Sequence, residues 1–269
     1  MALKLFTISL VIFVVLASGK GSFGDENVKN VDYYEGFQRV PPAMETARKL
    51  YKYFLSGDTR RIHKRQVLRN FFDAIMVIDS SSSVSSGEFA KGLAALQQLV
   101  EKSRNDTNYA AITYASHAQV QFNFSLSDEA TEKFSSIKRS GGKTNTQEAL
   151  KLCQKMFAGD EYGARKGSFR RILVVSDGQS NIKRAETVPS AVQLKLQGVD
   201  VFVIAVGEYL DGIQEMVQMA SSTGAHMYRV MNMRGLAEIV KLIPERGQRP
   251  WIDDIFGETE DNSNPLGRL

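Results

Sequence analysis

The chain has 269 residues, a formal net charge of +4 and a hydrophobic fraction of 43%. That fraction is ordinary for a globular protein, so a collagen-like or wholly disordered chain is excluded. The length allows one domain of roughly 180 residues with flanking segments, or two small domains. Basic residues are scattered except for one cluster at residues 60–65. The charge therefore gives no reason to expect a nucleic-acid partner.

The N-terminus has the pattern of a secretory signal peptide. Lys4 precedes an apolar run over residues 5–16, and small residues follow at 17–19. The run is shorter than the roughly 20 apolar residues of a membrane-spanning helix, and the alternatives to a signal peptide are an uncleaved anchor or a buried strand. We expect residues 1–19 to be removed at secretion. The protein is therefore predicted to be extracellular, without a segment that spans a membrane.

Cysteine and glycosylation motifs agree with secretion without deciding it. Cys153 is the single cysteine of the chain, so no internal disulfide can form. Its place on an apolar helical face predicts a buried thiol. Asn105 and Asn123 each begin an Asn-x-Ser/Thr sequon, and they are the candidate glycosylation sites.

Residues 20–70 form a polar, basic segment without a strand pattern. Apolar spacing after the two prolines at 41–42 predicts an amphipathic helix over residues 43–55. Lys64 and Arg65 form a dibasic pair shortly before the first predicted strand. The pair is either a processing site that releases a propeptide or part of a solvated linker. We favour the linker, because the preceding arginines do not occupy the position that the strictest processing proteases prefer.

From Phe71 the sequence alternates between apolar strands and amphipathic helices. Short apolar strands separated by helices are typical of a parallel sheet that is covered on both faces. A tight turn places residues 118–122 antiparallel to the strand before them. We therefore predict an α/β, doubly wound fold with a mostly parallel six-stranded sheet, one antiparallel edge strand and helices on both faces. The predicted strands are 73–78, 110–114, 118–122, 172–175, 201–206 and 227–230, and the predicted helices are 88–102, 146–157, 187–197, 212–220 and 236–242.

The C-terminal part of the chain, past Pro244, is acidic and rich in Gly, Ser, Asn and Pro, which is typical of disorder. The predicted organisation has four parts. They are a signal peptide at 1–19, an N-terminal segment or propeptide at 20–70, one domain at 71–244 and an acidic tail at 245–269.

The first of three polar clusters ends the strand predicted at residues 73–78. Ligands of open α/β sheets bind at the carboxyl ends of the strands. In an extended loop alternate residues point the same way, so Asp79, Ser81 and Ser83 can converge on one point. A carboxylate and two hydroxyls are hard oxygen ligands that suit Mg²⁺, Mn²⁺ or Ca²⁺ and not zinc. The same run also fits turns and a capping box formed by Ser85 and Glu88.

The other two clusters lie before a predicted helix and after a predicted strand. Gly141 and Gly142 allow the backbone to approach an ion closely, and Thr144 offers a further hydroxyl or a helix cap. A phosphate loop is excluded, because Ile137 stands where its first glycine is required. Asp177 follows the most hydrophobic strand and adds a second carboxylate, or a turn residue, at the same edge.

Together these residues resemble the metal-ion-dependent adhesion site of the von Willebrand factor type A family. The order Asp79-x-Ser81-x-Ser83, then Thr144, then Asp177 matches that family's motif, and the strands around it match as well. The likeness covers about residues 71–244 and is greatest to A domains of matrilins and type VI-like collagens. This chain differs from many relatives because it has no flanking cysteines and a single domain, which puts covalent assembly in doubt.

The resemblance implies a cation at the top of the sheet, with Mg²⁺ expected first and Mn²⁺ or Ca²⁺ as alternatives. It also implies an open coordination position for a Glu or Asp carboxylate of a protein ligand, such as a matrix or collagen-like protein. We therefore expect a secreted, non-enzymatic adhesion protein. The alternatives are a structural matrix component in which the metal only stabilises the fold, an effector activated by cleavage after Arg65, and a secreted hydrolase that uses serine and one of the three histidines.

Overall fold

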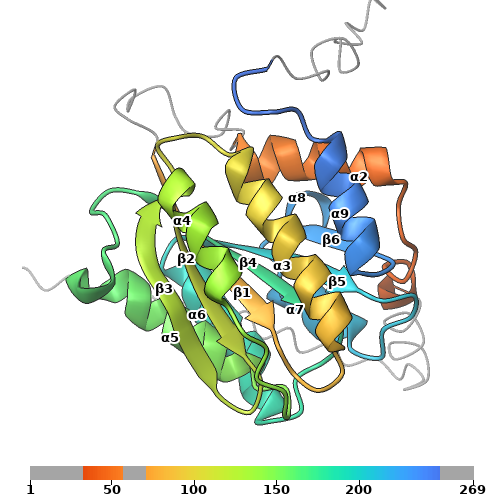
Figure 1. The fold of residues 1–269 in the computed structure, drawn as a ribbon. Helices are drawn as coiled ribbons and strands as arrows, with labels where there is room; N and C mark the ends of the chain where they lie inside the picture. Colours follow the sequence, from red (N-terminus) through yellow and green to blue (C-terminus); the bar gives the residue numbers. More distant parts are fainter. Residues whose placement is uncertain (1–32, 57–70, 249–269) are drawn as a thin grey trace, which may run out of the picture.

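The computed structural model of the protein describes residues 33–56 and 71–248. At its centre is a six-stranded sheet in the order β3-β2-β1-β4-β5-β6 (Figure 1). Four neighbouring pairs are parallel, and β3 pairs antiparallel with β2 at one edge. The predicted doubly wound sheet and its antiparallel edge strand are therefore confirmed. The strands are β1 Phe72–Asp79, β2 Asn108–Tyr114, β3 Ala118–Leu126, β4 Phe169–Ser176, β5 Val199–Val206 and β6 Met227–Val230.

The central strands are apolar throughout because both faces of the sheet are covered. Every residue of β1 is buried. Successive side chains of a strand point to opposite faces, and accordingly Met76 lies in the core on one face while Ile75 and Val77 lie in the core on the other. The edge strand β3 instead contains buried, half-buried and exposed positions. Polar residues along β3 interrupt the apolar pattern from which a strand is predicted. The strand extends four residues past the predicted end at Phe122.

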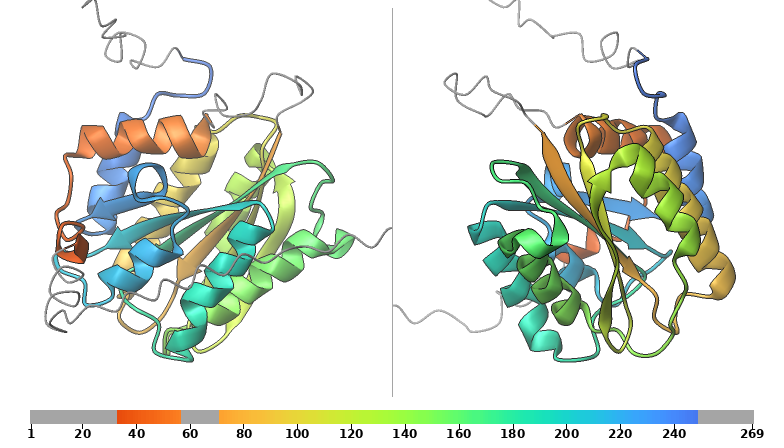
Figure 2. Two further views of the ribbon diagram at one scale, coloured as in Figure 1. Left: turned by 180° about the vertical axis from the view of Figure 1, so that it is seen from behind. Right: turned by 60° about the vertical axis from the view of Figure 1, so that its left-hand side comes forward.

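Helices cover the two faces in two groups, which Figure 2 shows from behind and from the side. One face carries α2 Ala43–Lys49 with its π-helical continuation Leu50–Leu55, α3 Ser86–Glu101, α4 Ser127–Lys133 and α9 Met233–Leu242. The other face carries α5 Thr146–Ala158, α6 Thr187–Leu196 and α7 Ile213–Met219. Short helical turns complete the chain: Phe134–Ser136, Asp160–Tyr162, Arg184–Glu186 and α8 Thr223–His226.

The sequence does not predict α4. Its residues, Ser127–Lys133, are mostly polar, and only Ser127 and Ala130 are buried, so the helical spacing of apolar residues is missing. Two side-chain hydrogen bonds to its first turn hold the helix instead. The Thr131 hydroxyl donates to the Ser127 carbonyl oxygen at 2.8 Å, and the Arg246 guanidinium donates to the Asp128 carboxylate at 2.6 Å.

The N-terminal helix packs into the core of the domain. Ala47, Leu50, Phe54 and Leu55 are almost fully buried and belong to the same core cluster as β1 and α9. The predicted amphipathic helix at residues 43–55 is therefore present, and its apolar face lies on the sheet. The hydrophobic core thus begins well before Phe71.

The start of α3 carries half of the expected capping box. The Ser85 hydroxyl accepts a hydrogen bond from the Glu88 backbone N–H at 3.2 Å. The Glu88 carboxylate, however, accepts from the backbone N–H of Met233 at 2.9 Å and from the Lys91 ammonium at 2.9 Å. Glu88 therefore joins the first turns of α3 and α9.

Two further expectations concern burial and membrane insertion. Cys153 is fully buried, and burial raises the pKa of its thiol well above the usual range. It is therefore the inert thiol that the sequence predicts. Within residues 33–56 and 71–248, no helix combines the length and the hydrophobicity that a bilayer crossing requires.

Candidate metal centre

Two aspartates lie side by side at the carboxyl ends of the two central strands. Asp79 is the last residue of β1, and Asp177 follows the last residue of β4. The strands β1 and β4 are parallel neighbours and pair at Ile78 and Val175, which lie one residue before Asp79 and two residues before Asp177. This adjacency follows from the strand order, because the chain crosses from one half of the sheet to the other between these strands.

A chain of hydroxyls bridges the two carboxylates. The backbone N–H of Ser81 donates to Asp79 Oδ1 at 2.9 Å, which folds the loop back over the end of β1. The hydroxyl oxygens of Ser81 and Ser83 are 2.9 Å apart, and the Ser83 hydroxyl donates to Asp177 Oδ1 at 2.9 Å. Four of the five predicted ligands are thus joined in one cluster.

Burial makes the Asp79 carboxylate costly to ionise. Desolvation, together with a smaller effect of the Asp177 charge, raises the pKa of Asp79 to about 6, although hydrogen bonds from Ser81 and Ser176 oppose the shift. Burial also raises the pKa of Asp177, against the hydrogen bond from Ser83. Neither aspartate forms an ion pair with a Lys, Arg or His among the described residues. Within the described part of the chain, no ion pair therefore compensates the charge of these two carboxylates.

The donor set fits a hard divalent cation. It offers two carboxylates and three hydroxyls, and hard cations such as Mg²⁺ and Ca²⁺ prefer oxygen ligands. In the described part of the chain, no three His, Cys, Asp or Glu side chains gather into a metal-binding group. The metal centre is thus distinguished by its hydroxyls, and the histidine or thiolate ligands that favour zinc are absent from it.

Thr144 reaches this edge of the sheet on a loop that contacts both aspartate-bearing loops. On one side, the Gly141 N–H donates to the Ser80 carbonyl oxygen at 2.8 Å, and the Ser82 N–H donates to the Gly142 carbonyl oxygen at 2.9 Å. On the other side, the Thr144 carbonyl oxygen accepts hydrogen bonds from three donors of the loop after Asp177: the N–H groups of Asn181 and Ile182 and the hydroxyl of Ser180. The backbone thus holds the fifth predicted ligand between the other four.

Several residues that the sequence analysis did not identify shape this cluster. The Ser176 hydroxyl donates to Asp79 Oδ2 at 2.8 Å and orients that carboxylate from behind. The Asn181 side chain accepts from the Thr144 N–H at 2.9 Å, and the Arg139 guanidinium donates to the Ser81 carbonyl oxygen at 3.0 Å. Their signal in the sequence is weak, because a serine inside a strand and an arginine in a loop are common in any protein.

The remaining candidate sites lie apart from the metal centre. Asn105 and Asn123 are both exposed, as a glycan requires. The Asn105 side chain accepts a hydrogen bond from the Arg246 guanidinium at 2.6 Å. Lys64 and Arg65 lie outside the described residues, as do residues 1–19.

The family model of the von Willebrand factor type A domain matches residues 73–242. The chain belongs to the von Willebrand factor type A domain family. The resemblance found in the sequence is thereby confirmed, and the domain is called the A domain below.

Relatives of this A domain occur within much longer chains. The human collagen alpha-5(VI) chain is 24% identical over 228 residues, which cover 82% of this chain and 8% of that one. A mouse protein, von Willebrand factor A domain-containing protein 2, is 31% identical over 157 residues, covering 55% and 19%. Mouse integrin alpha-X is 23% identical over 185 residues, covering 65% and 16%. The chain thus spans less than a fifth of each relative.

Solved structures with this fold include proximal thread matrix protein 1 from the mussel byssus. One crystal form has a TM-score of 0.59 at 19% identity, covering 65% of this chain and 47% of that one. A second structure of that protein, described as having a zinc occupied MIDAS motif, has a TM-score of 0.58 at 20% identity with the same coverage. At these identities the similarity shows the shared fold alone.

Proposed function

We propose that this protein is an extracellular matrix or adhesion protein that binds a protein ligand through a divalent cation. The cation is held by Asp79, Ser81, Ser83, Thr144 and Asp177. One observation carries the proposal. The buried carboxylate of Asp79 and the half-buried carboxylate of Asp177, bridged by hydroxyls at 2.9 Å, form no ion pair among the described residues. A cation at this position compensates the charge of both carboxylates.

Mg²⁺ is the cation that we propose first, with Mn²⁺ and Ca²⁺ as alternatives, because all five ligands carry oxygen. Three neutral hydroxyls leave part of the cation's charge uncompensated, so the bound ion attracts a Glu or Asp carboxylate of a partner. Relatives among collagen VI chains and an integrin subunit support a protein partner in the extracellular matrix. A structural neighbour with a zinc occupied MIDAS motif supports cation binding at this edge of the fold.

The role of the protein in this proposal is binding and not catalysis. The strongest candidate for a hydrolase centre among the described residues is Ser222, whose hydroxyl lies 2.8 Å from His226 Nδ1. The same hydroxyl accepts the Ala225 backbone N–H and so caps the short helix α8. This serine acts as a local cap, and we propose no reaction for it. Turnover of an ester substrate that disappears in His226→Ala would contradict this assignment.

The test of the metal centre is calorimetric titration of the secreted protein with Mg²⁺. The variant Asp79→Ala removes one ligand, and Asp160→Ala is the matched control because its side chain is 85% exposed and lies in the turn Asp160–Tyr162. We expect the wild-type protein and the control to bind Mg²⁺ and Asp79→Ala to lose binding. Equal affinities in all three proteins would overturn the proposed metal centre.

The test of adhesion uses the same three proteins on collagens and matrix glycoproteins, first with Mg²⁺ and then with EDTA. Cation-dependent adhesion predicts binding that is lost both in EDTA and in Asp79→Ala. A protein that binds Mg²⁺ but adheres equally well in EDTA would be a structural matrix component, in which the metal stabilises the fold.

A further inference from the structure

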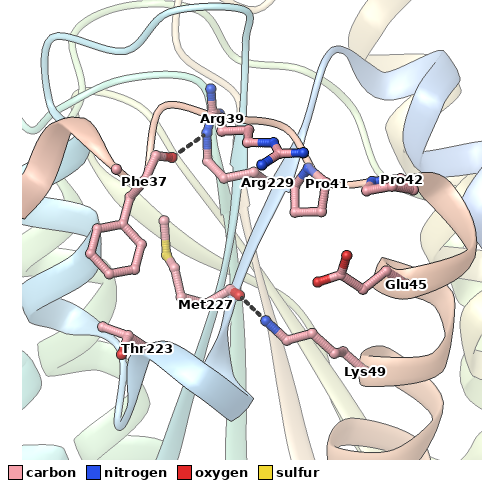
Figure 3. Close-up of a pocket in the computed structure, with 10 residues that line it drawn as sticks. Phe37, Arg39, Pro41, Pro42, Glu45, Lys49, Thr223, Met227 and Arg229 are labelled. Atoms are coloured by element: carbon pink, nitrogen blue, oxygen red, sulfur yellow. Dashed lines mark hydrogen bonds between the residues drawn. The ribbon is translucent and has the colours of Figure 1, made fainter.

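A second polar site lies at the far edge of the sheet from β3. It is a pocket of about 260 Å³ between residues 36–49 and the strand β6 (Figure 3). In the sheet β5 separates β6 from β4. The pocket therefore shares no residue with the metal centre on β1 and β4.

Positive charge dominates the lining of this pocket. Arg39, Lys49 and Arg229 line it, and Glu45 is the one carboxylate among its lining residues. The walls between these groups are formed mainly by Phe37, Pro41, Pro42 and Met227. Figure 3 shows Arg39 and Arg229 together at one side of the pocket, with Lys49 and Glu45 reaching into it from α2.

Arg229 is a rigid cation without a carboxylate partner among the described residues. Its guanidinium donates only to backbone carbonyl oxygens: those of Phe37 at 3.0 Å, Ala205 at 2.9 Å, Gln38 at 3.2 Å, Gly207 at 2.8 Å and Glu208 at 3.2 Å. These bonds hold its position and leave its charge uncompensated. Burial accordingly lowers the pKa of Arg229.

Lys49 and Arg39 have donors to offer a ligand. The Lys49 ammonium carries three N–H groups and donates to the Met227 carbonyl oxygen at 3.2 Å. Burial lowers the pKa of Lys49, and the nearby charge of Glu45 only partly opposes that shift. Arg39 is exposed, and within the described ranges its side chain makes no hydrogen bond or ion pair. Its planar fork of donors is therefore open to solvent at the pocket.

We propose that this pocket binds a tetrahedral oxyanion, a sulfate or phosphate group, carried by a small ligand. The open guanidinium of Arg39 and the ammonium of Lys49 can donate charge-assisted hydrogen bonds to the oxygens of such a group, while the fixed Arg229 adds positive charge. The volume lies just below that of pockets that take drug-sized ligands. It holds one oxyanion and a part of its carrier, which is either a sulfated sugar or a phosphorylated headgroup.

The test is calorimetric titration of the secreted protein with inorganic sulfate and inorganic phosphate in EDTA, which leaves the metal centre empty. Arg39→Gln removes the open guanidinium, and we expect it to weaken anion binding about tenfold, as loss of a hydrogen bond to a charged group does. Glu45→Gln removes the competing carboxylate and should strengthen binding about threefold. Lys241→Gln is the control, because it removes one exposed charge on α9, away from the pocket.

Arg39→Gln and Glu45→Gln should thus change the affinity for the anion in opposite directions. A protein that binds neither anion, or whose affinity falls equally in Arg39→Gln and Lys241→Gln, would overturn the proposal. Competition with a sulfated disaccharide and with glycerol phosphate then identifies the carrier, because the correct carrier displaces the inorganic anion at lower concentration. All these outcomes are independent of Mg²⁺ binding, so they separate this site from the proposed adhesion function.

Discussion

The guanidinium of Arg171 donates a hydrogen bond to the backbone carbonyl oxygen of Phe54, which joins β4 to the last turn of the N-terminal helix. The same guanidinium lies over the ring of Phe72, 3.6 Å from the ring centroid. Desolvation lowers the pKa of Arg171 to about 10, while the charge of Asp200 opposes the shift. The cation is thus kept in the interior by a carbonyl oxygen and an aromatic ring, and the N-terminal helix supplies the carbonyl.

The N-terminal helix should therefore contribute strongly to stability. Phe54 is 2% exposed and packs edge-on against Phe202, with ring centroids 5.2 Å apart. We expect Phe54→Ala to lower the free energy of unfolding by about 3–5 kcal/mol, as cavities left by buried aromatic residues do. Met44→Ala is the control on the same helix, because Met44 is 38% exposed. Urea unfolding followed by circular dichroism measures the free energy of unfolding of both variants. A small and equal decrease in the two variants would contradict the contribution of this helix to the core.

Bound Mg²⁺ should stabilise the fold by mass action. At a Mg²⁺ concentration of 100 times Kd we expect the free energy of unfolding to rise by about 2.7 kcal/mol, since the ion binds only the folded chain. EDTA should remove this increment from the wild-type protein. Asp79→Ala should show no increment at any Mg²⁺ concentration, whereas Asp160→Ala should keep it. Thermal unfolding with and without EDTA measures the difference, and an increment that survives in Asp79→Ala would place the ion elsewhere.

The loop of Thr144 should be sensitive to substitution at Gly142. This glycine has a φ of +110°, and a Cβ atom there would lie 2.6 Å from the Ser116 hydroxyl oxygen. That hydroxyl accepts a hydrogen bond from the Lys143 N–H at 3.1 Å, directly beside Thr144. Gly142→Ala should therefore displace the loop and weaken Mg²⁺ binding roughly tenfold, because backbone strain of this kind costs about 1–3 kcal/mol.

The matched control for this prediction is Gly178→Ala. Gly178 also adjoins a proposed ligand, but a Cβ atom there meets nothing within 4 Å. Mg²⁺ titration of both variants should leave Gly178→Ala close to the wild-type protein. Similar losses of Mg²⁺ affinity in the two variants would show that any substitution next to a ligand weakens binding. The backbone geometry at Gly142 would then not be the cause.

The contribution of His226 to stability should be lost at mildly acidic pH. Burial against the Phe202 ring, whose centroid is 4.3 Å away, lowers the pKa of His226 below the usual 6.5 of a histidine, and the charge of Asp200 opposes this. The unfolded chain then binds a proton at a higher pH than the folded chain does. The contribution of His226 to the free energy of unfolding therefore decreases as the pH falls from about 7 through 6.5 to the lowered pKa, and levels off below it. Asp79, with its pKa raised to about 6, contributes in the opposite direction over this range, so the His226 contribution is isolated by substitution.

His226→Gln should remove this contribution to the pH dependence, while His117→Gln should not, since the His117 side chain is 81% exposed. Urea unfolding at several pH values between about 5 and 8 measures the slopes. If the two variants keep the same slope as the wild-type protein, another group controls the acid response of the fold.

Much of the sheet could be predicted because strands that are buried on both faces appear in the sequence as short, continuous apolar runs. The predicted strand at residues 73–78 falls within the observed Phe72–Asp79, and the strand at 227–230 matches Met227–Val230. The predicted start of the antiparallel edge strand is correct, but its end could not be predicted, because past Phe122 the burial of residues does not follow their polarity: Ser125 is buried and Leu126 is exposed.

The sequence motif indicates the residues of the proposed metal centre, but it does not indicate their contacts. The spacing of Asp79, Ser81 and Ser83 indicates three side chains that converge, but it cannot show that the Ser83 hydroxyl meets Asp177 across 94 positions of sequence. The oxyanion pocket left no pattern at all, because its cations come from residues 39, 49 and 229. Sites assembled from segments so far apart depend on tertiary packing, which a local motif does not contain.

The contacts of the N-terminal segment also determine the order in which the fold can be completed during synthesis. Lys49 hydrogen bonds to Met227, 178 positions later, and Gln38 bonds to Leu210, 172 positions later. A ribosome that adds about 5–20 residues per second therefore releases this helix many seconds before its partners exist. The helical segment of residues 43–55 emerges before every strand of the sheet but is among the last described elements to find its native contacts, and until then its apolar face needs a chaperone or transient contacts for cover.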